Sequence, residues 1–189
     1  MRLALVLPLT VIVVACAAEK EDAPPPCGAD TNEPNDTASA ATSLGALQDD
    51  AELYEADAVP NKVTKAFSTH TGADVDWYTV DVRDTGLGGN PSVSVIVGKG
   101  HEATAFWSCT NGPTESVRCV PGTPVTNDPD LPGAQGGAAV DPGESAPPQL
   151  TMQIECSGTP TDSGKLQVRV KRTAQGDTCE RYTLTVLVQ

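Results

Sequence analysis

Apolar and polar residues alternate along several short segments in the C-terminal two-thirds of the chain. In one of them, the apolar residues Tyr78, Val80 and Val82 are separated by polar ones. An apolar side chain at every second position is typical of a β-strand with one face in a core. The clear segments are residues 77–82, 92–97, 150–155, 166–171 and 182–188, and the weaker ones are residues 62–68, 103–109 and 116–120.

Residues that favour turns separate these segments from one another, since Gly, Pro, Asn and Asp stand between them. About eight short strands joined by turns favour an all-β fold. We therefore expect one domain over residues 31–189, an all-β, antiparallel β-sandwich of the jelly-roll type.

Two segments depart from this pattern. Residues 37–47 are rich in alanine and follow Asn35 and Asp36, and they favour a short helix. Residues 121–148 hold seven prolines and five glycines, no lysine or arginine, and almost no apolar periodicity. A loop of that length inside a compact domain is usually either functional or disordered, and this composition favours disorder.

The N-terminus has the pattern of an export signal. Arg2 supplies a positive charge, and the run from Leu3 to Ala15 is apolar except for Pro8 and Thr10. A run of about 13 residues is too short to span a bilayer, which needs about 20, but it suits a secretory signal peptide. We expect residues 1–15 to be this signal peptide.

Cys16 directly follows Val13-Val14-Ala15, an arrangement that resembles the lipobox of bacterial lipoproteins. The resemblance implies cleavage before Cys16 and acylation of this cysteine, which would anchor the protein in a membrane. Ala17 after the cysteine resembles lipoproteins sorted to an outer membrane, and we expect the protein there or at the cell surface. Ala15-Cys16-Ala17 also fits an ordinary signal peptidase site, which would give a soluble secreted protein.

Residues 16–30 are predicted to form a tether between this anchor and the domain. The segment is charged and contains the run Pro24-Pro25-Pro26. Such a polar, stiff composition cannot bury a core. We expect the segment to be a disordered spacer that lifts the domain off the membrane.

The charge balance of the whole chain is strongly acidic. Its 12 Lys+Arg stand against 25 Asp+Glu, a formal net charge of −13. A surface of this sign repels phosphate backbones, so we expect no nucleic acid partner. The same surface is compatible with divalent cations.

The cysteines agree with export. Besides Cys16 the chain has five, none of them in a CxxC pair, and disulfides in an oxidising compartment explain them better than zinc. They are Cys27, Cys109, Cys119, Cys156 and Cys179. Because five is odd, at most two bridges form among them. A turn signal between Cys109 and Cys119 favours a hairpin bridge there, and the pairing of the other three stays open.

Four short motifs stand out along the chain: Glu33-Pro34-Asn35-Asp36, Asp74-Val75-Asp76-Trp77-Tyr78, the segment 164–170 and the segment 182–186. Together they resemble the bacterial pre-peptidase C-terminal domain. The resemblance covers about residues 31–189 and implies a β-sandwich that is not catalytic and usually accompanies exported enzymes. The chain departs from the family at Gln167, where an aromatic residue is usual, in the inserted stretch 121–148, and in its extra cysteines.

The resemblance also implies a calcium site, because relatives in collagen-degrading enzymes bind calcium near this N-terminal segment. The candidate ligands are Glu33, Asn35, Asp36, Asp74 and Asp76, whose oxygens are of the type that calcium prefers. To share one ion, the segment with Glu33, Asn35 and Asp36 would need to fold back onto Asp74 and Asp76. Alternatively, the N-terminal residues cap the short helix and the two later aspartates form a turn before a strand.

No enzyme motif stands beside these residues. The chain has no G-x-S-x-G sequence, and His101-Glu102 does not continue into H-E-x-x-H. We therefore expect a non-catalytic, membrane-anchored lipoprotein whose sandwich binds a protein or a glycan, with Trp77 or Trp107 either exposed as an anchor or packed in the core. The alternatives are an accessory protein that docks a secreted hydrolase and, more remotely, a hydrolase without a recognisable motif.

Overall fold

The computed structural model describes residue 27 and residues 32–49, 59–85, 90–143, 146–158, 161–174, 176 and 178–189. The predicted signal peptide, Cys16 and most of the predicted tether lie outside this part of the chain. Within it, no helix has the length and apolar character needed to cross a membrane.

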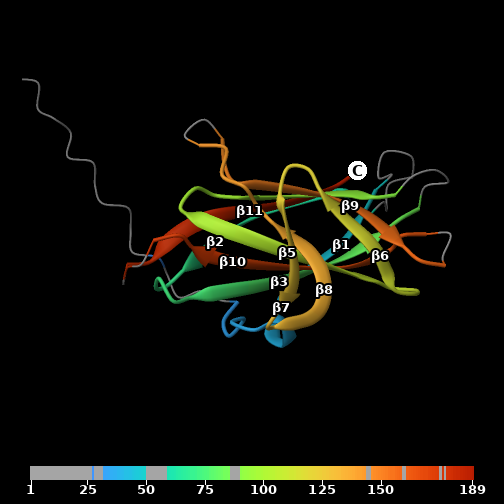
Figure 1. The fold of residues 1–189 in the computed structure, drawn as a ribbon. Helices are drawn as coiled ribbons and strands as arrows, with labels where there is room; N and C mark the ends of the chain where they lie inside the picture. The colour runs from blue at the N-terminus through green and yellow to red at the C-terminus, as the bar shows by residue number, and fades with distance from the viewer. Residues whose placement is uncertain are drawn as a thin grey trace, which may run out of the picture.

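The described residues form eleven strands in two sheets that pack face to face as a β-sandwich (Figure 1). The first sheet has the order β1 (Thr42–Gln48), β3 (Val75–Arg83), β10 (Gly164–Arg172), β5 (His101–Cys109), β8 (Leu131–Ala138) and β7 (Thr123–Asp128). The second has the order β2 (Lys62–Thr69), β11 (Glu180–Val188), β4 (Ser92–Val97), β9 (Gln149–Cys156) and β6 (Thr114–Cys119). All neighbouring strands are antiparallel except β1 and β3. The expected antiparallel β-sandwich is confirmed.

Each of the eight predicted segments is a strand, and its alternation marks the face that enters the core. On β10, for example, Leu166, Val168 and Val170 are buried in the core between the sheets. The residues between them are less buried. Burial of alternate apolar side chains against the opposite sheet is the main force that selects this fold.

The prediction of a long disordered loop at residues 121–148 is wrong, because β7 and β8 form a hairpin there. Its glycines allow close packing rather than disorder. A Cβ on Gly136 would lie 2.0 Å from the carbonyl oxygen of Ala105, and one on Gly137 would lie 2.4 Å from Cys119 Sγ. Prolines are tolerated in β7 because it is an edge strand of its sheet.

The prediction of a helix over residues 37–47 is also wrong. A short 3₁₀ helix, η1 (Ala38–Ala40), is followed directly by β1. Leu44 and Leu47 of β1 are buried in the core. Gly45 lies between them with a φ of 97°, at a break in the β1–β3 register. This glycine interrupts the period of two, which hid the strand in the sequence.

A second, smaller packed layer lies on the outer face of the first sheet. Trp77 and Phe106 are buried there with ring centroids 6.1 Å apart, and Arg169 lies 5.5 Å from the Trp77 ring. Asp128, at the end of β7, forms an ion pair with Arg169 at 2.8 Å. The β7–β8 hairpin therefore curls over this face, as the strong bend of β8 in Figure 1 shows.

Two disulfides join Cys27 to Cys179 and Cys109 to Cys156. The predicted Cys109–Cys119 bridge is wrong, and Cys119 forms no disulfide in the described part of the chain. The reason is that β5 and β6 are not a hairpin within one sheet: β6 crosses to the second sheet and pairs with β9. This crossing carries Cys119 away from Cys109 and brings the end of β9, with Cys156, close to it.

Candidate cation site

Three of the predicted ligands come together at one end of the sandwich. Carboxylate oxygens of Glu33, Asp36 and Asp74 all lie within 4.8 Å of one another. Glu33 and Asp36 stand in the segment that leads to η1, whereas Asp74 immediately precedes β3. The N-terminal segment has folded back onto the D-V-D sequence in the way that a shared ion requires.

Backbone contacts hold the two segments in this position. Trp77 N donates to the carbonyl oxygen of Asn35 at 2.9 Å, which ties the N-terminal segment to β3. Asp74 Oδ2 accepts from His70 N at 2.6 Å, and Glu33 Oε2 accepts from Asn35 N at 3.0 Å. One oxygen of Asp74 and one of Glu33 are thereby oriented by the backbone.

Asn35 and Asp76, the other two predicted ligands, lie fully buried beside this cluster. With the Asn35 amide oriented to suit its neighbours, its nitrogen donates to Glu33 Oε2 and to Asp76 Oδ1, both at 3.2 Å. Tyr182 Oη donates to Asp76 Oδ2 at 2.6 Å. Both oxygens of Asp76 therefore accept hydrogen bonds from protein groups, and this pair supports the cluster from behind.

Tyr182 is the centre of this buried polar group. Its hydroxyl lies 2.7 Å from that of Tyr78. Burial, and then the proximity of Tyr78 and Asp76, raise the pKa of Tyr182 far above its ordinary value. The hydroxyl consequently keeps its proton and can donate a hydrogen bond to Asp76.

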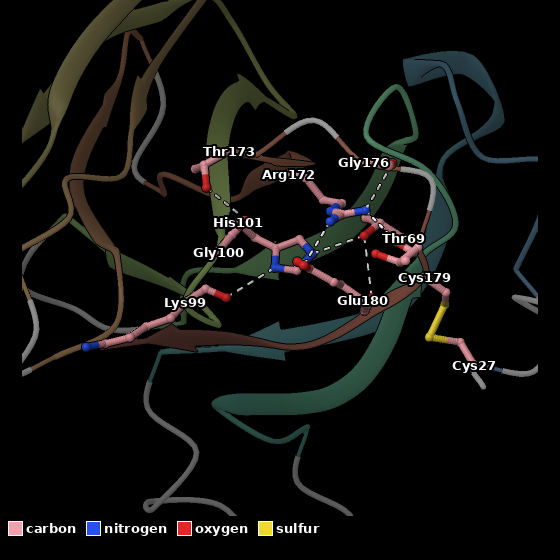
Figure 2. Close-up of polar contacts among 11 residues, drawn as sticks. Cys27, Thr69, Lys99, Gly100, His101, Arg172, Thr173, Gly176, Cys179 and Glu180 are labelled. Atoms are coloured by element: carbon pink, nitrogen blue, oxygen red, sulfur yellow. Dashed lines mark hydrogen bonds and ion pairs between the residues drawn. A yellow bond between two sulfur atoms is a disulfide. The ribbon is translucent and has the colours of Figure 1, made fainter. Parts of the chain in front are cut away.

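The ring of His101 packs against Tyr182, with centroids 4.5 Å apart. Figure 2 shows His101 enclosed by Thr69 and the backbone of Lys99. Its Nε2 is 3.1 Å from Thr69 Oγ1, and its Nδ1 is 3.4 Å from the Lys99 carbonyl oxygen. Burial lowers the pKa of His101 below its ordinary 6.5, so the neutral ring is the form that the fold favours.

Arg172 closes this end of the molecule next to His101. Its guanidinium forms an ion pair with Glu180 at 2.8 Å and donates to the carbonyl oxygens of Gly176 and Thr178 (Figure 2). The adjacent Cys179 carries the disulfide to Cys27. The arginine thus fixes the segment between β10 and β11 to which the start of the domain is covalently joined.

The cluster of carboxylates is chemically suited to a hard divalent cation. Glu33 and Asp36 are exposed and Asp74 is nearly buried, so the group is open to solvent on one side. Calcium takes six to eight oxygen ligands, including water and backbone carbonyls. The residues present fit calcium, with protein carboxylates for part of the shell and water for the remainder.

The structure also shows where the two tryptophans and His101, singled out in the sequence, lie in the fold. Trp77 and Trp107 are both buried, 0% and 1% exposed, so the packed alternative holds and neither is a surface anchor. His101 is bonded to Thr69, as described above. No sequence motif announces the group of His101, Arg172 and Glu180, because its members stand on separate strands and meet only in the fold.

Comparison of the sequence with known protein families and with curated proteins finds no match. Among solved structures, the fold is similar to PliG of Aeromonas hydrophila, a periplasmic lysozyme inhibitor of g-type lysozyme, with 14% identity over 78% of this chain and 98% of that one and a TM-score of 0.41. It is similar to the pre-peptidase C-terminal domain of a collagenase from Bacillus anthracis, with 14% identity over 79% and 94% of the two chains and a TM-score of 0.38. It is also similar to CorA, a surface-associated copper-binding protein of Methylomicrobium album BG8, with 13% identity over 79% and 99% and a TM-score of 0.33. These similarities are remote and concern the fold alone. One of the three structures belongs to the family that the sequence motifs resemble.

Proposed function

We propose that this protein is an exported, non-catalytic binding module whose N-terminal segment is fastened to the sandwich by one calcium ion. The observation that supports this proposal is the convergence of Glu33, Asp36 and Asp74, whose carboxylate oxygens lie within 4.8 Å of one another. Like charges so close repel one another, and a bound cation would turn this repulsion into attraction.

The open, irregular set of ligands suits calcium better than magnesium. Oxygens that share one calcium ion lie about 2.3–2.6 Å from it, so they can be up to about 5 Å apart, which this cluster satisfies. Calcium accepts flexible coordination of this kind, whereas magnesium demands a near-ideal octahedron at about 2.0–2.1 Å. With three carboxylates and an open side, the site should bind calcium with a Kd of about 10⁻⁴–10⁻³ M, as extracellular modules do.

The role of the ion would be structural. It would hold the segment that follows Cys27 against β3, at the end of the sandwich that the Cys27–Cys179 disulfide also closes. A module fastened in this way keeps its other surfaces rigid for a protein or glycan ligand. We assign no catalytic role to it, because His101 is buried against Thr69 and Tyr182 rather than paired with a nucleophile.

Thermal unfolding with and without calcium tests this proposal. At about 10 mM calcium, a Kd of about 10⁻⁴–10⁻³ M adds about 1.4–2.7 kcal/mol to the free energy of unfolding. For a domain of this size, the midpoint should then rise by about 3–10 °C over the protein in EDTA. Asp36→Asn should abolish the shift, whereas Asp81→Asn, which removes an exposed charge on β3, should keep it. An equal shift in both variants would contradict the proposed site.

The membrane anchor is a separate part of the proposal. Acylation of Cys16 would leave only the residues up to Cys27 between the membrane and the first disulfide. Eleven residues span at most about 40 Å when fully extended, so the anchored end of the sandwich would stay near the membrane. Mass spectrometry of the mature protein should show a diacyl or triacyl group on an N-terminal Cys16. An unmodified N-terminus at Ala17 or Ala18 would refute the anchor and leave the calcium proposal untouched.

A further inference from the structure

A hollow of about 460 Å³ lies at the end of the sandwich opposite the calcium site. Strand β5 shows this separation: it begins at His101, opposite Arg172, and ends at Cys109, opposite Gly164. The Cys27–Cys179 disulfide lies at the first end, whereas the hollow lies at the second. With a rise of about 3.3 Å per residue, nine residues place the two ends about 27 Å apart. The hollow therefore lies at the end of the sandwich away from Cys27.

Two turns form the walls of the hollow. One contains Gly112 and Pro113 of the β5–β6 turn and Thr114 at the start of β6, and the other contains Asp130 of the β7–β8 turn and residues 131–135 of β8. Gln135 Nε2 donates to the Thr114 carbonyl oxygen at 3.1 Å and so connects them. The Cys109–Cys156 disulfide fixes the base of the first turn. The hollow is consequently preformed, which reduces the entropy that a ligand would have to overcome.

The lining combines apolar walls with one charged group at the rim. Pro113, Leu131 and Pro132 supply apolar surface above the buried Trp107. The only lining side chain with a formal charge is Asp130, which is 51% exposed. Such a volume is within the range of small-molecule and side-chain binding pockets, about 300–1,000 Å³.

The charge at the rim is not neutralised by the protein itself. Arg169 Nη1 is 2.8 Å from Asp128 Oδ2 but 3.6 Å from Asp130 Oδ2, so two carboxylates share one guanidinium. This group of three has a net charge of −1. The net charge of −13 on the chain adds a long-range field of the same sign, which attracts cations and repels anions.

An unpartnered hydrogen-bond donor completes the description. Trp107 Nε1 is buried and has no hydrogen-bond partner among the described residues. Buried indole N–H groups usually find a partner. The indole is 1% exposed, so it lies beneath the hollow, where its signal can report binding without a direct contact.

We propose that this hollow binds an arginine or lysine side chain of a basic protein partner. The apolar stem of the side chain would pack on Leu131 and the two prolines, and its cationic head would meet Asp130 at the rim. This inference names the kind of ligand for the binding module, and it does not depend on the calcium ion.

Nuclear magnetic resonance with blocked tripeptides tests the proposal. Acetyl-Gly-Arg-Gly-amide, added at millimolar concentration to the ¹⁵N-labelled protein, should shift the Trp107 indole signal and the amide signals of residues 110–112, 114, 131 and 133–135. The same peptide with citrulline, which is neutral but nearly isosteric, should leave them unshifted. Asp130→Asn should weaken the arginine peptide by about fivefold. Asp130→Glu should retain its binding, and Asp81→Asn serves as the control for loss of a charge elsewhere.

Each other outcome would overturn the proposal. Equal shifts with the citrulline peptide would show that charge is not recognised, and an absence of shifts would show that the hollow takes no such side chain. Shifts confined to the signals of Glu33, Asp36 and Asp74 would indicate non-specific attraction to the acidic cluster. The titration is done in EDTA, so its result does not depend on whether calcium binds at the other end of the sandwich.

Discussion

Replacement of Tyr182 by phenylalanine tests the buried hydrogen bonds that support the carboxylate cluster of Glu33, Asp36 and Asp74. The change removes one oxygen atom from a side chain that is 4% exposed. It deletes the 2.6 Å hydrogen bond to Asp76 Oδ2 and the 2.7 Å contact with the Tyr78 hydroxyl. Asp76 keeps the bond from the Asn35 amide but loses its strongest donor, while the aromatic packing of the ring is retained.

The size of the effect follows from the burial of the acceptor. Removing the donor to a buried acceptor costs about 1–3 kcal/mol, because Asp76 has no access to water that could replace the lost hydrogen bond. We expect Tyr182→Phe to lower the free energy of unfolding by about 2–3 kcal/mol. For a domain of this length, the thermal midpoint should then fall by about 4–12 °C.

Urea unfolding monitored by tryptophan fluorescence measures this loss. Thr185→Val on the same strand is the control, since it deletes an exposed hydroxyl that is bonded to Thr64 at 3.0 Å, and it should cost less than about 0.5 kcal/mol. A double-mutant cycle with Asp76→Asn should give a coupling energy of about 1 kcal/mol or more. If Tyr182→Phe costs no more than the control, or if the cycle gives no coupling, the reasoning about this buried bond is wrong.

Three further predictions concern the rest of the fold. Replacing both Cys109 and Cys156 by serine should cost about 4 kcal/mol by the loop-closure argument for a separation of 47 residues, as urea unfolding would show; a loss below about 1 kcal/mol would contradict it. Gly136→Ala should destabilise the β7–β8 hairpin by about 1–3 kcal/mol, because the new methyl group meets the backbone of β5, and wild-type stability would argue against this close approach. Because burial lowers the pKa of His101 below 6.5, the unfolded state binds the proton first; stability should be complete above about pH 6.5 and fall as the pH drops through the folded pKa. In His101→Gln this part of the pH dependence should disappear, and an unchanged pH profile would exclude His101 as its source.

The strands with regular alternation could be predicted because side chains at every second position must enter the core. The β7–β8 hairpin could not, because its packing depends on the lack of side chains at Gly136 and Gly137. From the sequence alone, glycines and prolines that let two strands pack closely cannot be distinguished from those of a disordered loop. The β1 strand was hidden for a similar reason, since the break at Gly45 removes its alternation.

The candidate site shows the same division. The motifs at residues 33–36 and 74–78 were expected to meet, on the basis of their resemblance to a family, and Glu33, Asp36 and Asp74 do so. The roles of individual residues depend on burial, which no motif encodes. Asp76 is enclosed by Asn35 and Tyr182, and Tyr182 lies more than 100 positions away in the chain.

The disulfides illustrate a limit that spacing alone imposes. A turn signal between Cys109 and Cys119 suggested one hairpin, yet the two strands enter different sheets. Sheet membership depends on the pairing of β6 with β9, which is far away in the sequence. Pairing of cysteines could be deduced only after this crossing was known.

Calorimetric titration of calcium into the purified protein tests the central claim most directly. The account predicts one calcium per chain with a Kd of about 10⁻⁴–10⁻³ M. Binding should be lost in Asp36→Asn and retained in Asp81→Asn. Heat that does not saturate, or equal binding by both variants, would contradict the assignment of Glu33, Asp36 and Asp74 as the calcium site.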